Sequence, residues 1–175
     1  MDQFDQQYFL YQNLRQFREI DNASQILGEE KTPMWAKSES LLHWINKVTE
    51  EAIDHNRLIE SNDTALIALG KCYDLYQRKL EERNALDFST IQLEALNLLR
   101  NNPVVLESLK GRIQYLMVDE YQDTNTIQEM ILMLLMGKDQ NLCVVGDDDQ
   151  ALYRFRGATI RNILQFPDNF DDSKC

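Results

Sequence analysis

Two groups of carboxylates follow short apolar segments of this chain, and the first has the spacing of a metal and phosphate site. Residues 116–125 read LMVDEYQDTN, so Asp119 and Glu120 end an apolar run and Asp123 follows shortly after. Carboxylates presented in this way suit a hydrated Mg²⁺ ion, which prefers one or two carboxylates together with water and phosphate oxygens. A solvated turn is the other interpretation, because aspartate is common in turns. Asp123 fits either ligand contact or hydrogen bonds that hold the loop.

The second group lies in residues 141–150, which read NLCVVGDDDQ and end on an amide, Gln150. Asp147 and Asp148 are equally well explained as turn formers. In a parallel sheet, ligands bind beyond the carboxyl ends of the strands. If both apolar runs are neighbouring parallel strands, the two groups are expected to meet at one edge of the sheet.

The elements around these groups predict a βαβ unit. Residues 112–120, RIQYLMVDE, form a continuous β-prone run without clean alternation, which favours a strand buried on both faces. Residues 125–137 read as a helix that ends at Gly137, and residues 142–146 read as a second short strand. A crossover between parallel strands is expected to be right-handed.

The chain before this unit, to about residue 110, has the apolar period of amphipathic helices, and one buried face per helix is expected. Three apolar stripes are predicted to form core: Leu10, Leu14 and Phe17; Leu41, Ile45, Val48 and Ala52; Leu66, Leu69, Tyr73, Tyr76 and Leu80. Asp87 is placed to cap a fourth helix. A short helix should follow, with Pro103 near its start and Gly111 past its end. The predicted fold class is α/β, with a mainly helical N-terminal part.

The composition argues against several classes of protein and of binding site. The 175 residues carry a formal net charge of -11, which argues against a self-sufficient nucleic-acid binder but not against part of one. The three cysteines include no CxxC pair, so neither zinc nor a disulfide framework is indicated, and a reducing cytoplasm fits best. No apolar run reaches the length of a membrane span, and no membrane partner is expected.

The two acidic segments resemble motifs of a known family. VDEYQDTN followed by VVGDDDQALYRFRGA is similar to motifs II and III of the UvrD/Rep/PcrA family of superfamily 1 DNA helicases. ALDFSTIQ resembles the family's LDFDDL element, with Ser89 and Thr90 where two acids are common. The resemblance implies a helical insertion subdomain over residues 1–84. It also implies a partial RecA-like (P-loop NTPase) domain over residues 85–175, with motif II as its Walker B box.

The resemblance also implies roles for matching residues in ATP hydrolysis. Asp119 would hold Mg²⁺ through water, and Glu120 would be the base that activates the attacking water. Gln150 would sense the γ-phosphate of ATP. Positioning and charge neutralisation supply most of the catalysis of phosphoryl transfer, which suits this division.

Residues after motif III would contact single-stranded DNA, because an aromatic ring can stack on a base and an arginine can reach a phosphate. Those residues are Tyr153, Phe155 and Arg156. Phe155 stands where many relatives carry tryptophan, and stacking survives that change. Ala151 stands where the family often has serine, so any hydroxyl contact at that position is lost.

The 175 residues contain no G-x-x-x-x-G-K-[ST] loop, whose backbone and lysine hold the phosphates in P-loop NTPases. The resulting hypothesis is an internal segment of an ATP-dependent 3′ to 5′ DNA helicase, with DNA repair, replication and recombination all open as its pathway. Such a segment would be inactive without the P-loop segment and a second RecA-like domain, and its partners in the intact protein would be ATP and single-stranded DNA. Two alternatives stay open: part of a RecB/AddA-type helicase-nuclease, and a degenerate, non-catalytic interaction module.

Overall fold

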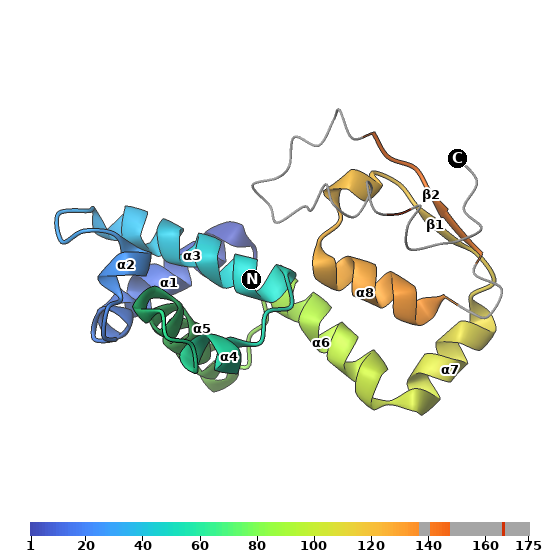
Figure 1. The fold of residues 1–175 in the computed structure, drawn as a ribbon, viewed down its shortest axis with the longest axis horizontal. Coiled ribbons are helices and arrows are strands. Elements are labelled where there is room, and N and C mark those ends of the chain that lie inside the picture. The colour runs from blue at the N-terminus through green and yellow to red at the C-terminus, as the bar shows by residue number, and fades with distance from the viewer. Residues whose placement is uncertain (137–140, 148–165, 167–175) are drawn as a thin grey trace. The chain divides into compact units, whose positions relative to one another are not determined.

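The computed structural model describes residues 1–136, 141–147 and 166 (Figure 1). The chain forms two compact units, residues 1–91 and 92–175, and each is described by itself. Six helices begin in the first unit: α1 Gln3–Arg18, α2 Ser24–Leu27, α3 Met34–Glu50, α4 His55–Ile59, α5 Thr64–Glu82 and α6 Phe88–Asn101, the last of which continues into the second. None of the helices in the described part of the chain has the length and apolar character needed to cross a membrane.

The helical stripes predicted from the sequence form the core of the first unit. Each of the following is at most 5% exposed: Leu10, Leu14, Phe17, Leu41, Ile45, Val48, Leu69, Tyr73, Tyr76 and Leu80. Two members of the predicted stripes lie elsewhere, since Leu66 is exposed and Ala52 falls beyond the end of α3 at a φ of 51°. The period therefore identified the buried faces, with one exception at the start of the third stripe and one at the end of the second.

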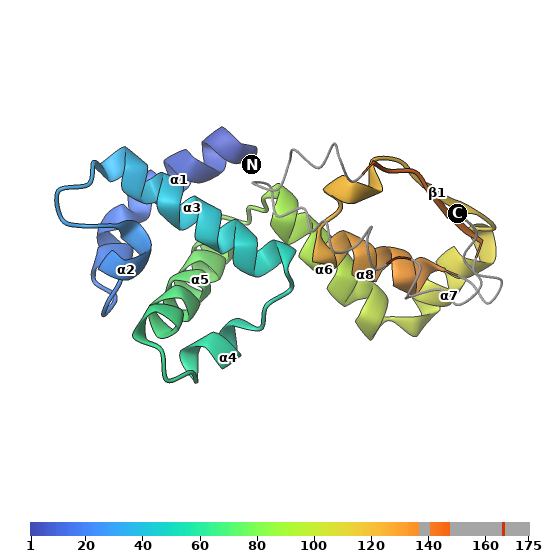
Figure 2. The same cartoon turned by 45° about the horizontal axis from the view of Figure 1, so that its top comes forward.

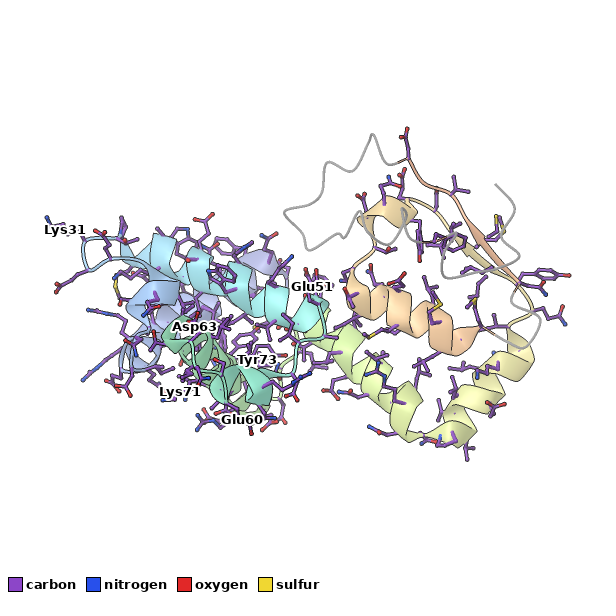
Figure 3. All side chains as sticks on the ribbon, in the orientation of Figure 1. Lys31, Glu51, Glu60, Asp63, Lys71 and Tyr73 are labelled. Carbon is purple, nitrogen blue, oxygen red and sulfur yellow. The ribbon has the colours of Figure 1, made fainter. Side chains whose placement is uncertain are left out.

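The start of α5 and its close contact with α4 both follow from single residues. Asp63, labelled in Figure 3, precedes α5. It begins the helix by accepting a hydrogen bond from the Ala65 amide at 2.7 Å, which satisfies a donor that has no partner within the helix. Gly70 lets α4 approach α5 closely, because a Cβ there would lie 2.7 Å from Cγ1 of Ile59 and 2.9 Å from the carbonyl oxygen of His55.

A buried polar cluster joins the start of α6 to α1 and α5. Asp87 is 2% exposed and accepts hydrogen bonds from the Thr90 amide at 2.8 Å and the Thr90 hydroxyl at 2.9 Å, which confirms the predicted cap. The same carboxylate accepts from the Tyr76 hydroxyl and, at 3.2 Å, from the Gln6 amide. Burial, followed by the charge of Asp87, raises the pKa of Tyr76, so the phenol stays a donor.

Glu50, the last residue of α3, lies near this cluster and accepts a hydrogen bond from the Ser89 hydroxyl at 3.0 Å. Burial raises the pKa of Glu50 from 4.5 to about 7. The Ser89 hydrogen bond and Lys47 oppose the rise, whereas Glu51 and Asp87 add to it. The carboxyl group therefore titrates near neutral pH in the folded protein.

Replacing Glu50 with glutamine should remove this pH dependence while keeping an acceptor for Ser89. Between pH 4.5 and about 7 the folded state binds more protons than the unfolded state, so the stability due to protonation is present below pH 4.5 and lost as the pH rises through 7. At pH 8 the variant should be about 2 kcal/mol more stable than the wild type, a figure discounted for partial exposure. Urea denaturation at pH 4.5 and pH 8 measures this. A stability difference that is the same at both values would contradict the prediction.

The second unit contains the predicted βαβ arrangement. Its further elements are α7 Pro103–Arg112, β1 Leu116–Val118, the 3₁₀ turn η1 Tyr121–Asp123, α8 Thr126–Leu135 and β2 Leu142–Val144. The strands are parallel, with Leu116 opposite Leu142 and Val118 opposite Val144. Asn125 begins α8 through a capping box with Gln128. The strand–helix–strand order and the parallel pairing are as predicted.

The ends of α7 and α8 agree only in part with the ends predicted from the sequence. Pro103 is the first residue of α7, as expected, but Gly111 lies inside its last turn, because the helix continues to Arg112 and Ile113 is the cap. Gly137, the expected end of α8, lies outside the described residues, which place the cap at Met136.

The prediction that the first strand is buried on both faces is wrong. Burial alternates along both strands, and Met117 and Cys143, a register pair, are exposed, with Met117 at 79%. Figures 1 and 2 show α8 running alongside the strands, and Val118 lines a pocket together with Leu132 of α8. In the described part of the chain, α8 covers one face of the sheet and leaves the other exposed.

Candidate functional site

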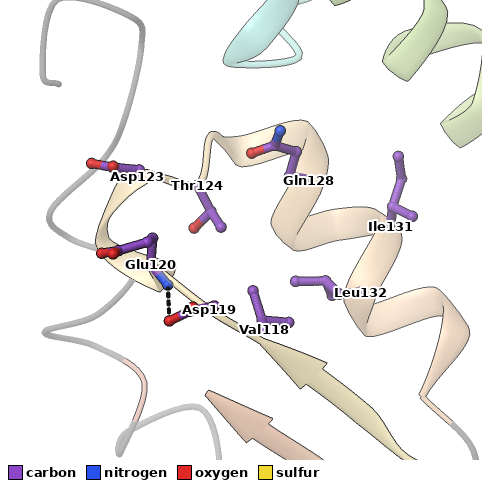
Figure 4. Close-up of a pocket in the computed structure, with 8 residues that line it drawn as sticks. All are labelled: Val118, Asp119, Glu120, Asp123, Thr124, Gln128, Ile131 and Leu132. Atoms are coloured by element: carbon purple, nitrogen blue, oxygen red, sulfur yellow. Dashed lines mark hydrogen bonds between the residues drawn. The ribbon is translucent and has the colours of Figure 1, made fainter. Parts of the chain in front are cut away.

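A pocket of about 440 Å³ lies at the carboxyl end of β1 (Figure 4). Its polar side comes from the loop after the strand, and its apolar side comes from β1 and α8. The lining residues are Val118, Asp119, Glu120, Asp123, Thr124, Gln128, Ile131 and Leu132. All three acids of the first segment, Asp119, Glu120 and Asp123, therefore border one pocket.

Glu120 has an unusual backbone conformation. Its φ of 51° and ψ of 44° place it in the left-handed region, which costs a residue other than glycine about 1–2 kcal/mol. This residue turns the chain from β1 into η1, and Asp119 closes the turn by accepting from the Glu120 amide at 3.0 Å. Strained backbone of this kind gathers at functional sites, where the surroundings hold it in place.

The loop after β1 and the segment after β2 are tied together. The strand ladder continues past its ends, since the Val145 amide donates to the Val118 carbonyl at 2.8 Å and the Tyr121 amide donates to the Val145 carbonyl at 2.9 Å. The side chain of Gln122 donates to Glu120 Oε2 at 2.6 Å and accepts from the Asp147 amide at 3.0 Å. The two acidic segments thus reach the same edge of the sheet, as far as Asp147.

Gln122 is a residue that the sequence interpretation missed. It is 2% exposed although it lies in a three-residue turn between acids. Its only signal in the sequence is its place two residues after Glu120, and its second partner comes from a segment 25 positions away. A contact of that kind cannot be inferred from local spacing.

Tyr121 packs rather than faces the pocket. Its side chain is 1% exposed and its hydroxyl donates to Glu129 at 3.1 Å. Burial, with the nearby Glu129 charge, raises the pKa of Tyr121. Its ring meets that of Phe166 edge to face at 5.5 Å. The interpretation of Tyr121 as a packing residue agrees with these contacts.

The side chain of Asp123 has an oxygen atom that is free to bind a cation or water. Its Oδ1 atom is buried and has no hydrogen-bond partner within the described residues. A buried acceptor without a donor calls for an ion or water. No group of three or more His, Cys, Asp or Glu side chains that could hold a metal is found in residues 1–136, 141–147 and 166. The carboxylates at this pocket fit a Mg²⁺ ion that is bound by one or two of them and otherwise by water. They do not fit a site in which the protein supplies every ligand.

The other residues predicted to act at the site lie outside the described residues. These are Gln150, expected at the γ-phosphate, and Tyr153, Phe155 and Arg156, expected on DNA. Asp148 and Asp149 lie there too. Their roles stay predictions.

Comparison with known proteins gives the context of this site. Residues 1–171 match the UvrD/REP helicase N-terminal domain. The chain is 44% identical over 115 residues to the ATP-dependent DNA helicase PcrA of Staphylococcus epidermidis, covering 66% of this chain and 16% of that protein. It is 39% identical over 145 residues to the ATP-dependent DNA helicase UvrD1 of Mycobacterium tuberculosis, covering 77% of this chain and 19% of that protein.

The matched part of the chain thus spans only 16% and 19% of the length of these relatives. The family match, by contrast, covers nearly all of its residues, including both acidic segments and the helical unit before them. The chain therefore belongs to the UvrD/REP helicase family, within the N-terminal domain.

Proposed function

We propose that the chain is part of an ATP-dependent DNA helicase that couples ATP hydrolysis to 3′ to 5′ movement along single-stranded DNA. The observation that carries this proposal is the convergence of Asp119, Glu120 and the Asp147 backbone at one edge of a parallel sheet. That edge is where nucleotides bind in open α/β sheets. The relatives named ATP-dependent DNA helicases support the same activity.

In this proposal, residues 85–175 belong to a RecA-like ATPase domain and residues 1–84 to a helical insertion. Asp119 and Asp123 would hold Mg²⁺ through water, and the ion would neutralise charge on the phosphates. Glu120 accepts a proton from the attacking water and orients it. Gln150, which lies outside the described residues, would contact the γ-phosphate through its amide.

The intact helicase that we propose contains this chain together with a P-loop, and its ATP hydrolysis is the test. Phosphate release should rise on addition of single-stranded DNA. The 175 residues alone should neither hydrolyse ATP nor bind it at micromolar concentration, because they contain no loop to hold the phosphates. Calorimetric titration with Mg·ATP measures the second point. An intact protein without any ATPase activity would favour the non-catalytic interaction module instead.

Replacing Phe155 with alanine in the intact helicase should weaken binding of single-stranded DNA by about 1–3 kcal/mol, the usual contribution of one stacked base. DNA stimulation of the ATPase should fall as well. Fluorescence anisotropy with labelled oligonucleotides measures the affinity. Phe155→Trp is the matched control and should retain binding, since a larger ring still stacks. Unchanged affinity in the alanine variant would assign Phe155 to packing.

A further inference from the structure

The side chain of Gln122 joins two segments that the proposed mechanism uses separately. One end of its amide donates to the carboxylate of Glu120 at 2.6 Å, and the other end accepts from the backbone amide of Asp147 at 3.0 Å. We propose that Gln122 is a positioning residue that ties the Glu120 carboxylate to the start of the segment after β2. The role of Glu120 as base rests on the proposed function, whereas the tether itself rests on these two contacts.

Glutamine is suited to this place because its amide carries both a donor and an acceptor. At 2% exposure the side chain is almost out of reach of bulk solvent, which therefore does not readily replace a lost partner. A hydrogen bond to an ionised carboxylate is also stronger than one between neutral groups. Glutamate at this position could accept from Asp147 but would repel Glu120, and methionine could make neither contact.

Glu120 needs such a support because its own side chain is exposed at the pocket and its backbone is left-handed. A long, exposed carboxylate samples several rotamers unless a neighbour selects one. Misplacing a catalytic group by about 1 Å can cost about 100-fold in rate. The tether therefore selects one orientation of the base.

The same contact gives a physical route between the two ligands of the proposed helicase. Asp147 is followed directly in the chain by the residues expected to reach the γ-phosphate and DNA. A displacement of the Asp147 backbone would pull on Gln122 and reorient Glu120. We therefore expect Gln122 to matter most for the hydrolysis that DNA stimulates.

Hydrogen exchange in the 175-residue chain tests the tether without nucleotide. In Gln122→Met, exchange of the Asp147 amide should accelerate about tenfold or more, because the amide loses its acceptor. In Gln122→Glu it should stay protected, since a carboxylate oxygen can still accept. Gln114→Met, at an exposed glutamine of the same unit, is the matched control and should change nothing at Asp147. Unchanged exchange in Gln122→Met would overturn the proposal.

The wild-type chain offers a second measurement if a Gln122 variant does not fold. One side-chain amide proton of Gln122 should resonate downfield of the corresponding proton of Gln114, because it points at a carboxylate. The Glu120→Ala substitution should abolish that difference. A Gln122 resonance that does not respond to Glu120→Ala would overturn the proposal.

Steady-state kinetics in the intact helicase test the consequence. Gln122→Met and Gln122→Glu should both lower the DNA-stimulated kcat about 10- to 100-fold, with the KM for ATP changed less than about threefold. A role in folding alone would lower the active fraction of both variants without distinguishing DNA-stimulated from basal turnover. An intact wild-type protein without ATPase activity would remove the proposed function but leave the exchange result to decide the tether. Full DNA stimulation in both variants would overturn the positioning role.

Discussion

Replacing Glu120 with glutamine in the intact helicase is expected to lower kcat for ATP hydrolysis by about 10²–10⁴-fold, the usual contribution of a general base. The amide cannot take a proton from the attacking water. It can still accept the hydrogen bond that Gln122 donates to this position, so the loop and the pocket should keep their shape. Binding of Mg·ATP should therefore stay near normal.

Phosphate release and equilibrium nucleotide binding separate these two effects. Glu107→Gln removes the same charge from an exposed position on α7 and is the matched control, with wild-type turnover expected. Wild-type turnover in Glu120→Gln would exclude Glu120 as the base. A loss of nucleotide binding equal to the loss of turnover would assign Glu120 to the binding of the metal instead.

Replacing Asp87 with alanine is expected to lower the free energy of unfolding of the helical unit by about 3 kcal/mol. Asp87 is the acceptor for the Thr90 amide and hydroxyl, the Tyr76 hydroxyl and the Gln6 amide. Its removal leaves several buried donors without an acceptor, and each unsatisfied donor costs about 1–3 kcal/mol. The change also removes a helix cap. Local relaxation and water entry keep the sum below the simple total.

Tryptophan fluorescence during urea denaturation measures this effect in the right unit, because both tryptophans of the chain, Trp35 and Trp44, lie within residues 1–91. Asp87→Asn keeps an acceptor at the cap and should cost less than the alanine change. Asp74→Ala, at a partly exposed aspartate on α5, is the control for removal of a charge. A cost below about 1 kcal/mol for Asp87→Ala would mean that the cluster does not stabilise the unit.

The sequence predicts the helical unit well because amphipathic periodicity and caps are local signals. The stripe through Leu41, Ile45 and Val48 needed only the spacing of apolar residues, and the cap at Asp87 needed only the residues that follow it. The order strand, helix, strand was also readable from the change of period. Local patterns thus predicted the longer helices, the two strands and most of their buried faces, but not the short helices α2 and α4.

Features that depend on contacts distant in the chain were not readable in this way. An apolar run such as LMV shows that a strand can be covered but not which faces are covered, and Met117 lies on the face that is exposed. The hydrogen bond that the Asp147 amide donates to Gln122 depends on the register of two strands. The left-handed turn at Glu120 has no signal in the residue types around it. Acid types and spacing located the candidate site, whereas its internal geometry required the fold.

The left-handed backbone at Glu120 places function and stability in opposition at a single position. Glycine, and to a lesser extent asparagine, adopts that conformation more readily than glutamate, so either would relieve strain of about 1–2 kcal/mol in the second unit. A library sorted for thermal tolerance alone would therefore tend to discard the acid on which the proposed chemistry depends. An engineering programme for this domain should keep position 120 constant and seek its gains elsewhere, for example at Glu50.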